Sequence, residues 1–110
     1  TVDNGCPWVV PGLHRGGTLL HHWTDVGFQC FPSHPDAVAA PARAGSIVVF
    51  SSLTPHRTGP NVTDAVRKAY ILQYAPPHAA RLSEDEHGAV VTTPLPDTAF
   101  PILIDGAPPA

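Results

Sequence analysis

The chain has 110 residues, a formal net charge of −3 and only six Lys and Arg residues, which are scattered. This length suits one small domain, and the lack of a basic stripe argues against nucleic acid or an anionic membrane as a partner. The longest apolar runs, Ile47–Phe50 and Pro101–Ile104, are too short to cross a bilayer. We therefore expect a single partial domain over residues 1–110.

The 14 prolines and 9 glycines are spread along the whole chain. Proline breaks helices and glycine permits turns, so this composition predicts short strands joined by structured loops, an all-β fold class. One pair of cysteines, Cys6 and Cys30, does not make a disulfide framework, and we expect two free thiols in a reducing compartment. No basic stretch followed by an apolar stretch comes after Thr1, so there is no sign of a secretory signal and we expect a cytoplasmic protein.

In the first half of the chain, the apolar run 6–10 ends at a Pro-Gly turn signal. Residues 19–31 have no clean period and are predicted to form a loop with at most one short helical turn. The alanine-rich stretch 35–43 is predicted to hold a helical turn, limited by its internal proline. Residues 46–51 are apolar on both faces, which predicts a buried strand.

In the second half, residues 54–63 are rich in turn formers, and residues 67–74 form the clearest predicted strand. A charged loop is expected at 83–87, followed by a strand at 89–93. Residues 94–110 are predicted to form an extended tail with an apolar anchor at 102–104.

The residues that suggest chemistry lie on either side of this turn-rich region. His56 follows the predicted strand 46–51, and Arg67 begins the next strand eleven residues later. A non-haem iron oxygenase holds its metal with two His and one carboxylate, and leaves positions for a chelating co-substrate and O2. The far carboxylate of 2-oxoglutarate suits a buried Arg and a nearby hydroxyl such as Thr58. The structural alternative is that His56 caps a loop and Arg67 is a solvated edge residue.

Several segments resemble the phytanoyl-CoA dioxygenase family and occur in the family's order. Asp3-Asn-Gly-Cys-Pro-Trp-Val-Val-Pro-Gly-Leu-His-Arg15 is similar to the family's Asn-Gly-Cys segment. Ala44–His56 is similar to its strand-then-histidine segment, and a His-x-Thr-Gly-x-Asn pattern and an Arg eleven residues after the histidine follow. Phe100–Gly106 resembles the family's C-terminal tail.

The resemblance implies the C-terminal portion of a double-stranded β-helix, a cupin-like jelly roll. It also implies Fe(II), with 2-oxoglutarate and O2 as co-substrates, and hydroxylation of an unactivated C–H bond in a small molecule. Carried over to this sequence, His56 is the distal iron ligand and the catalytic residue, Arg67 binds the far carboxylate of 2-oxoglutarate, and Thr58 is its hydroxyl partner. Leu13 and Pro7 depart from the family pattern at positions that look structural.

The family's His-x-Asp motif, which supplies the other two iron ligands, precedes the Asn-Gly-Cys segment. Here only three residues precede Asn4, so we expect the motif to be cut away and this fragment to be inactive alone. Two alternatives stay open. Family halogenases replace the carboxylate of that motif with a small residue, and a jelly-roll module without metal would be a binding protein.

Three further features carry weaker hypotheses. His34-Pro-Asp36 has the His-x-Asp form but follows the Asn-Gly-Cys segment, and we interpret it as a loop turn. His21 and its neighbour lie in the irregular region 19–31, where the alternatives are substrate contact and solvent exposure. Asn61-Val-Thr63 is a glycosylation sequon, which we interpret as a turn because no secretory signal is visible.

Overall fold

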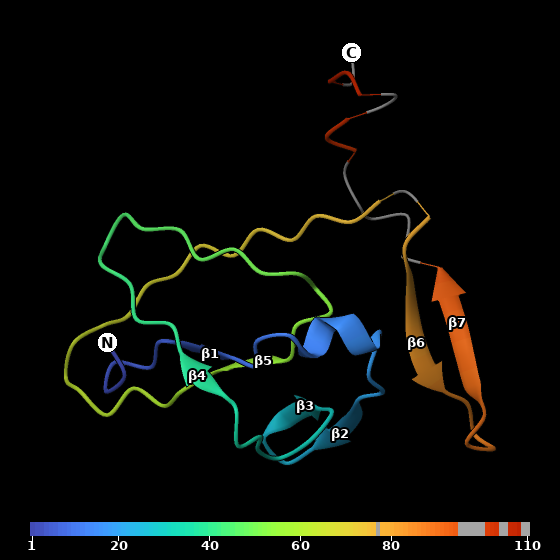
Figure 1. Cartoon of the computed structure of the whole chain (residues 1–110), viewed down its shortest axis with the longest axis horizontal. Helices are drawn as coiled ribbons and strands as arrows, with labels where there is room; N and C mark the ends of the chain where they lie inside the picture. The colour runs from blue at the N-terminus through green and yellow to red at the C-terminus, as the bar shows by residue number, and fades with distance from the viewer. Residues whose placement is uncertain (77, 95–100, 104–105, 109–110) are drawn as a thin grey trace. The chain divides into compact units, whose positions relative to one another are not determined.

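A computed structural model describes residues 1–76, 78–94, 101–103 and 106–108. Its contacts divide the chain into two compact units, residues 1–72 and 73–110. The described elements are β1 (Pro7–Val9), the 3-10 helix η1 (Leu13–Gly16), β2 (His22–Thr24), β3 (Gly27–Gln29), β4 (Val38–Ala39), β5 (His56–Thr58), β6 (Ala80–Glu84) and β7 (Val90–Pro94), as labelled in Figure 1. Within these residues there is no α-helix, and every sheet is antiparallel, so the predicted all-β class is confirmed.

The main sheet of the first unit has three strands in the order β4-β1-β5. Strand β1 is central, and Trp8 has Ala39 on one side and Arg57 on the other. The apolar run 6–10 therefore contains the central strand. It pairs with β4, about thirty residues later in the chain, and with β5, about fifty residues later. The sheet is closed by long-range pairing, which costs loop-closure entropy and must be offset by packing.

The pairing of β1 with β5 continues well past the two short strands. The Val10 amide donates to the Pro55 carbonyl (3.0 Å), the Gly59 amide to Cys6 (3.3 Å) and the Val62 amide to Asp3 (2.8 Å). An isolated bridge links Asn4 to Asn61 in the same register. We call this whole pairing of residues 3–10 with residues 55–62 the ladder. It brings the Asn-Gly-Cys segment against the His-x-Thr-Gly-x-Asn segment.

Gly5 permits the ladder to close. Its φ of 77° lies in the left-handed region, where side chains are disfavoured. A Cβ at this position would lie 2.7 Å from the Gly59 carbonyl oxygen and 3.2 Å from that of Pro60. The two backbones thus approach more closely than any residue with a side chain permits.

The core of the first unit is small and lies beside the ladder. Cys6 is 4% exposed, Val10 5% and Thr54 7%. Cys6 and Cys30 are both free thiols, as predicted. The burial is therefore concentrated at the two ends of β1 and just before β5, which holds these two segments in place.

The loop predicted for residues 19–31 is wrong in part, because its middle, residues 22–29, forms the β2–β3 hairpin. Trp23 pairs with Phe28 across the strands, with ring centroids 5.2 Å apart. The Thr24 hydroxyl donates to the Gly27 carbonyl (2.8 Å), and Gly27 has a φ of 117°. Aromatic cross-strand pairs and a glycine after a two-residue turn favour a hairpin, and the short turn of helix forms earlier, at η1.

The helical turn predicted within residues 35–43 is also wrong. This stretch supplies β4, whose two residues pair with Trp8 and Val9. The Ala40 amide then donates to the Pro7 carbonyl (2.8 Å). Pairing with the edge of β1 outweighs the modest helix preference of alanine in so short a segment.

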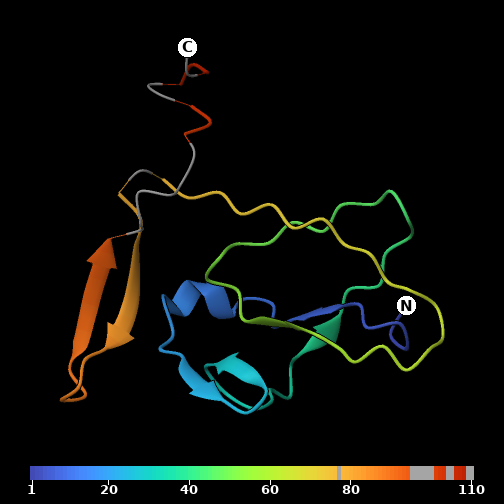
Figure 2. The same cartoon turned by 180° about the vertical axis from the view of Figure 1, so that it is seen from behind.

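Two predicted strands, 46–51 and 67–74, have no strand assignment in the structure. Figures 1 and 2 draw these stretches as plain trace, without arrows. Ile47 is 85% exposed, Val49 86% and Tyr70 89%. A strand requires a partner for its backbone groups, and none of the described residues provides one here.

The second unit contains the β6–β7 hairpin, which pairs Ala80 with Pro94 at one end and Glu84 with Val90 at the other. The strand predicted at 89–93 is confirmed with a shift of one residue. The predicted charged loop is shorter than expected, because β6 extends to Glu84. Its turn is closed by the Asp85 carboxylate, which accepts from the amides of His87 (2.8 Å) and Ala89 (2.9 Å).

Much of the predicted tail 94–110 falls outside the described residues. Two residues of its predicted apolar anchor are described, and both are exposed, Ile102 at 55% and Leu103 at 57%. Among the residues that the structure does describe, no helix is long and apolar enough to cross a membrane.

Candidate functional site

A pocket of about 500 Å³ lies against the β5 side of the main sheet, within the first unit. Its walls come from three stretches: β1, the segment from Thr18 to Ala37 that includes β3, and the segment from Ser52 to Thr58 that includes β5. Its lining contains three histidines and one arginine, and no Asp, Glu or Lys. The lining therefore offers imidazole groups and one positive charge, which would attract an anionic ligand.

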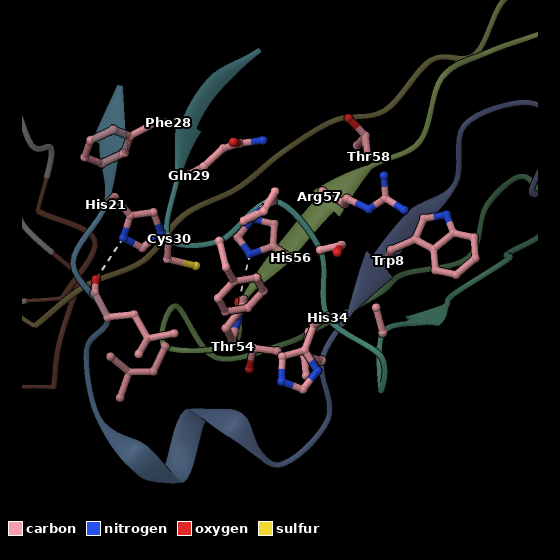
Figure 3. A pocket seen from close by; sticks show the side chains of 18 of the residues that line it. Trp8, His21, Phe28, Gln29, Cys30, His34, Thr54, His56, Arg57 and Thr58 are labelled. Carbon is pink, nitrogen blue, oxygen red and sulfur yellow. Dashed lines mark hydrogen bonds between the residues drawn. The ribbon is translucent and has the colours of Figure 1, made fainter. Parts of the chain in front are cut away.

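His56 lies in this lining at the first position of β5, where Val9 is its cross-strand partner. Its ring Nδ1 lies 2.9 Å from the Thr54 carbonyl, the dashed contact in Figure 3. A carbonyl only accepts, so Nδ1 carries the proton and Nε2 keeps its lone pair. Phe50 packs against the ring at a centroid distance of 4.5 Å. This is the tautomer and the backbone support typical of a metal-ligating histidine.

Thr58 lies two residues further along β5 and also lines the pocket. Successive strand side chains alternate between faces, so Thr58 and His56 share one face of β5. Arg57, between them, also lines the pocket and places its guanidinium 5.4 Å from the centroid of the Trp8 ring. The structure thus brings together two of the three residues predicted for the site.

Arg67 is not brought to the pocket. It is exposed, it lies outside any strand, and it is absent from the pocket lining. The backbone just before Arg67 is nonetheless fixed. The carbonyl of Ala65, two residues earlier, accepts hydrogen bonds from the side chains of Asn4 and Asn61. The role predicted for Arg67 stays a prediction.

The pocket also contains residues that the motif analysis did not select. His21, weighed only as a possible substrate contact, lines it with Nδ1 held 2.8 Å from the Leu19 carbonyl, the arrangement seen at His56. Phe28 stacks on this ring at 5.0 Å. Cys30 completes this wall. The available signal was the dense run of aromatic and histidine residues at 21–31, which has no helical or strand period.

The His34-Pro-Asp36 segment is a turn, as interpreted. The His34 Nδ1 accepts from the Asp36 amide at 3.2 Å, and the Asp36 carboxylate is 4.0 Å away. His34 lines the pocket, whereas Asp36 does not. The sequon is likewise a turn, since the Asn61 side-chain oxygen Oδ1 accepts from the amide (3.0 Å) and hydroxyl (2.7 Å) of Thr63.

Fe(II) and 2-oxoglutarate can be tested against this donor set. Within the described ranges, no cluster of three His, Cys, Asp or Glu side chains is arranged to hold a metal. The chain therefore contributes one fitting ligand, the neutral imidazole of His56, and the hydroxyl of Thr58 on the same face. An iron site of the two-His, one-carboxylate kind needs two more ligands.

Comparisons with known proteins identify the family. The family profile described as Phytanoyl-CoA dioxygenase (PhyH) matches residues 1–69. The chain is 31% identical over 74 residues to a methylphosphonate hydroxylase of Gimesia maris, covering 67% of this chain and 28% of that protein. It is 31% identical over 84 residues to a probable phytanoyl-CoA dioxygenase of Caenorhabditis elegans, covering 68% of this chain and 27% of that protein.

No solved structure matches the chain. The chain spans just over a quarter of the length of the curated relatives it matches. The family match covers more than half of the chain, including the whole ladder and the pocket. The chain therefore belongs to the phytanoyl-CoA dioxygenase family.

Proposed function

We propose that this chain is part of an Fe(II)- and 2-oxoglutarate-dependent dioxygenase that hydroxylates an unactivated C–H bond of a small molecule. The observation that carries the proposal is the orientation of the His56 imidazole in the pocket. Its Nδ1 is held by the Thr54 carbonyl, which leaves the lone pair of Nε2 available to a metal. One relative is named a hydroxylase and the other a dioxygenase, which supports the same class of reaction.

In this proposal each residue has a separate task. His56 supplies one iron ligand, with its orientation fixed by Thr54 and Phe50. Thr58 offers a hydroxyl to the co-substrate from the same face of β5. Arg67 pairs with the far carboxylate of 2-oxoglutarate, for which a guanidinium provides two parallel donors. The remaining imidazole and carboxylate would come from a His-x-Asp motif in the full-length protein, and the whole would form a jelly roll.

When bound, iron and its co-substrate supply the oxidation, in which 2-oxoglutarate and O2 yield succinate, CO2 and the hydroxylated substrate. The chain's own contribution is to place the donors and to cover the reacting region. Trp8, Phe28 and Phe31 line the same pocket with apolar rings and limit the entry of water. Two free thiols suit a reducing compartment, and we include a cytoplasmic location in the proposal.

The test is retention of Fe(II) by the full-length protein under anaerobic dialysis, compared between His56→Ala and His21→Ala. The two histidines share the same backbone contact and the same pocket, so His21→Ala is a matched control. We expect His56→Ala to lose the metal and His21→Ala to keep it. Equal retention by wild type and His56→Ala removes His56 from the iron site and contradicts the proposal. No retention by the wild type also contradicts it, and favours a non-catalytic binding module without metal.

The same preparation distinguishes hydroxylation from halogenation. Wild-type protein incubated with 2-oxoglutarate, O2 and chloride should form succinate, and its product should gain oxygen and no chlorine. A chlorinated product supports the halogenase alternative. The sequence of the coding region before Thr1 gives an independent answer, because an acidic third residue in the motif is expected for a hydroxylase and a small one for a halogenase.

A further inference from the structure

The Asn4 side chain crosses the end of the ladder and contacts a loop almost sixty residues away. Its amide nitrogen donates to the Asn61 side-chain oxygen (3.2 Å), the Thr63 hydroxyl (2.9 Å) and the Ala65 carbonyl (3.0 Å). We call these four residues the clasp. All three contacts join residues before β1 to residues after β5.

The three loop residues of the clasp are also hydrogen-bonded to one another. The Asn61 amide donates to the Ala65 carbonyl at 2.8 Å, and the Thr63 hydroxyl donates to the Asn61 side-chain oxygen at 2.7 Å. Because the Thr63 proton points to Asn61, the Thr63 oxygen is free to accept from Asn4. The Asn4 amide has two N–H donors for its three acceptors, so two of these acceptors share one N–H. Linked hydrogen bonds of this kind hold one geometry better than separate ones.

The position of the clasp gives it a role beyond the loop itself. The ladder ends at residues 3 and 62. The segment that follows, which includes Arg67, has no strand assignment before β6. The Ala65 carbonyl, two residues before Arg67, is held by two side-chain amides. Within the described residues these are the last hydrogen bonds that hold the chain before Arg67.

We propose that Asn4 is a positioning residue for Arg67. Through the clasp it sets the direction in which the chain leaves the ladder, and so the fraction of molecules in which Arg67 can pair with the far carboxylate of 2-oxoglutarate. Asn4 does not touch the co-substrate. This inference rests on the proposed function, in which Arg67 binds that carboxylate.

The test measures the dissociation constant for 2-oxoglutarate by anaerobic calorimetry on the Fe(II)-loaded full-length protein. Asn4→Asp keeps the shape of the side chain but replaces its donor with an acceptor that repels two clasp oxygens. We expect the constant to rise about tenfold, as for the loss of one or two hydrogen bonds. Thr63→Val should act in the same way, whereas its matched control Thr63→Ser keeps the hydroxyl and should stay within about twofold of wild type.

A double-mutant cycle distinguishes positioning of Arg67 by Asn4 from a general destabilisation of the fold. If Asn4 acts through Arg67, Asn4→Asp should add less than about twofold in an Arg67→Ala background. In turnover assays the Asn4 variant should raise KM for 2-oxoglutarate and leave kcat close to wild type. A full tenfold effect in the Arg67→Ala background overturns the inference, and so does an Asn4→Asp protein that binds 2-oxoglutarate normally.

The inference and the proposed function fail in different ways. If Arg67→Ala weakens binding and Asn4→Asp does not, only the positioning role is overturned. If the Fe(II)-loaded wild-type protein binds no 2-oxoglutarate, the proposed function is overturned and the inference with it.

Discussion

The ladder and the two unpaired segments, 46–51 and 67–74, reverse what their compositions predict. The unpaired segments carry denser strand-forming residues, such as the run Ile47–Phe50, whereas the ladder contains several Pro, Gly and Asn residues. Val10 in the ladder is 5% exposed, whereas Val49 in an unpaired segment is 86% exposed. The difference shows that a strand-forming composition is not enough. A partner must take up the backbone hydrogen bonds and cover the side chains.

The same contrast runs through the candidate site. His56 and Thr58 belong to the ladder and lie in the pocket. Arg67 belongs to an unpaired segment and lies outside the pocket lining. The clasp fixes the backbone two residues before it, at the Ala65 carbonyl. The following substitutions test how far this difference extends to function and stability, starting with the largest expected effect.

Replacing His56 with Ala should lower turnover of the full-length enzyme by about a thousandfold or more. A bound metal supplies several kcal/mol of stabilisation in the transition state, and that contribution is lost with its ligand. Succinate release from 2-oxoglutarate is the measurement. The His21→Ala variant is the control, and it should keep its capacity for 2-oxoglutarate turnover. Normal turnover by His56→Ala would remove His56 from the site.

Replacing Gly5 with Ala should destabilise the ladder by about 3 kcal/mol. It adds the strain of a left-handed residue to a Cβ that would lie 2.7 Å from the Gly59 carbonyl. Gly45 is the matched control: its φ is 84°, but nothing lies within 4 Å of an added Cβ. Gly45→Ala should therefore cost only about 1 kcal/mol. The measurement is chemical denaturation, and equal effects would show that close backbone approach contributes nothing.

Replacing Arg67 with Ala should raise KM for 2-oxoglutarate roughly 10- to 100-fold, since a charge-assisted pair contributes about 1.5 to 3 kcal/mol. The value of kcat at saturating co-substrate should change much less. Arg43→Ala is the natural comparison, because Arg43 is likewise exposed, outside any strand and absent from the pocket lining. An Arg67 variant with wild-type KM would confine Arg67 to a surface role.

The smallest effects concern the apolar side chains themselves. Val10→Ala should cost about 1.5 kcal/mol of unfolding free energy, from the methyl groups that lose their burial. Val49→Ala should stay within about 0.5 kcal/mol of wild type, as expected for an exposed position. Both values come from the same denaturation series. If the cost at Val49 matches that at Val10, the segment 46–51 is covered in solution, and the contrast with the ladder disappears.

Part of the fold could be read from local signals. The strand predicted at 89–93 is a strand within one residue, and the apolar run 6–10, bounded by its Pro-Gly turn signal, contains β1. In contrast, the β2–β3 hairpin was missed, because its signal, the Trp23–Phe28 pair and the glycine at 27, extends over only a few residues. The strand expected at 67–74 had the best local pattern, but a pattern cannot provide its own partner.

The sequence by itself determined the all-β class, the family motifs and the choice of His56, Thr58 and Arg67, because these depend on residue type and spacing alone. Tertiary structure decided the ladder register, which brings Asn4 to Asn61 and leaves Gly5 no room for a side chain. It also decided that His21 and Cys30 share a pocket with His56. The physical reason is that pairing between residues more than fifty positions apart is chosen by packing and hydrogen bonding in the folded chain, which no local sequence window contains.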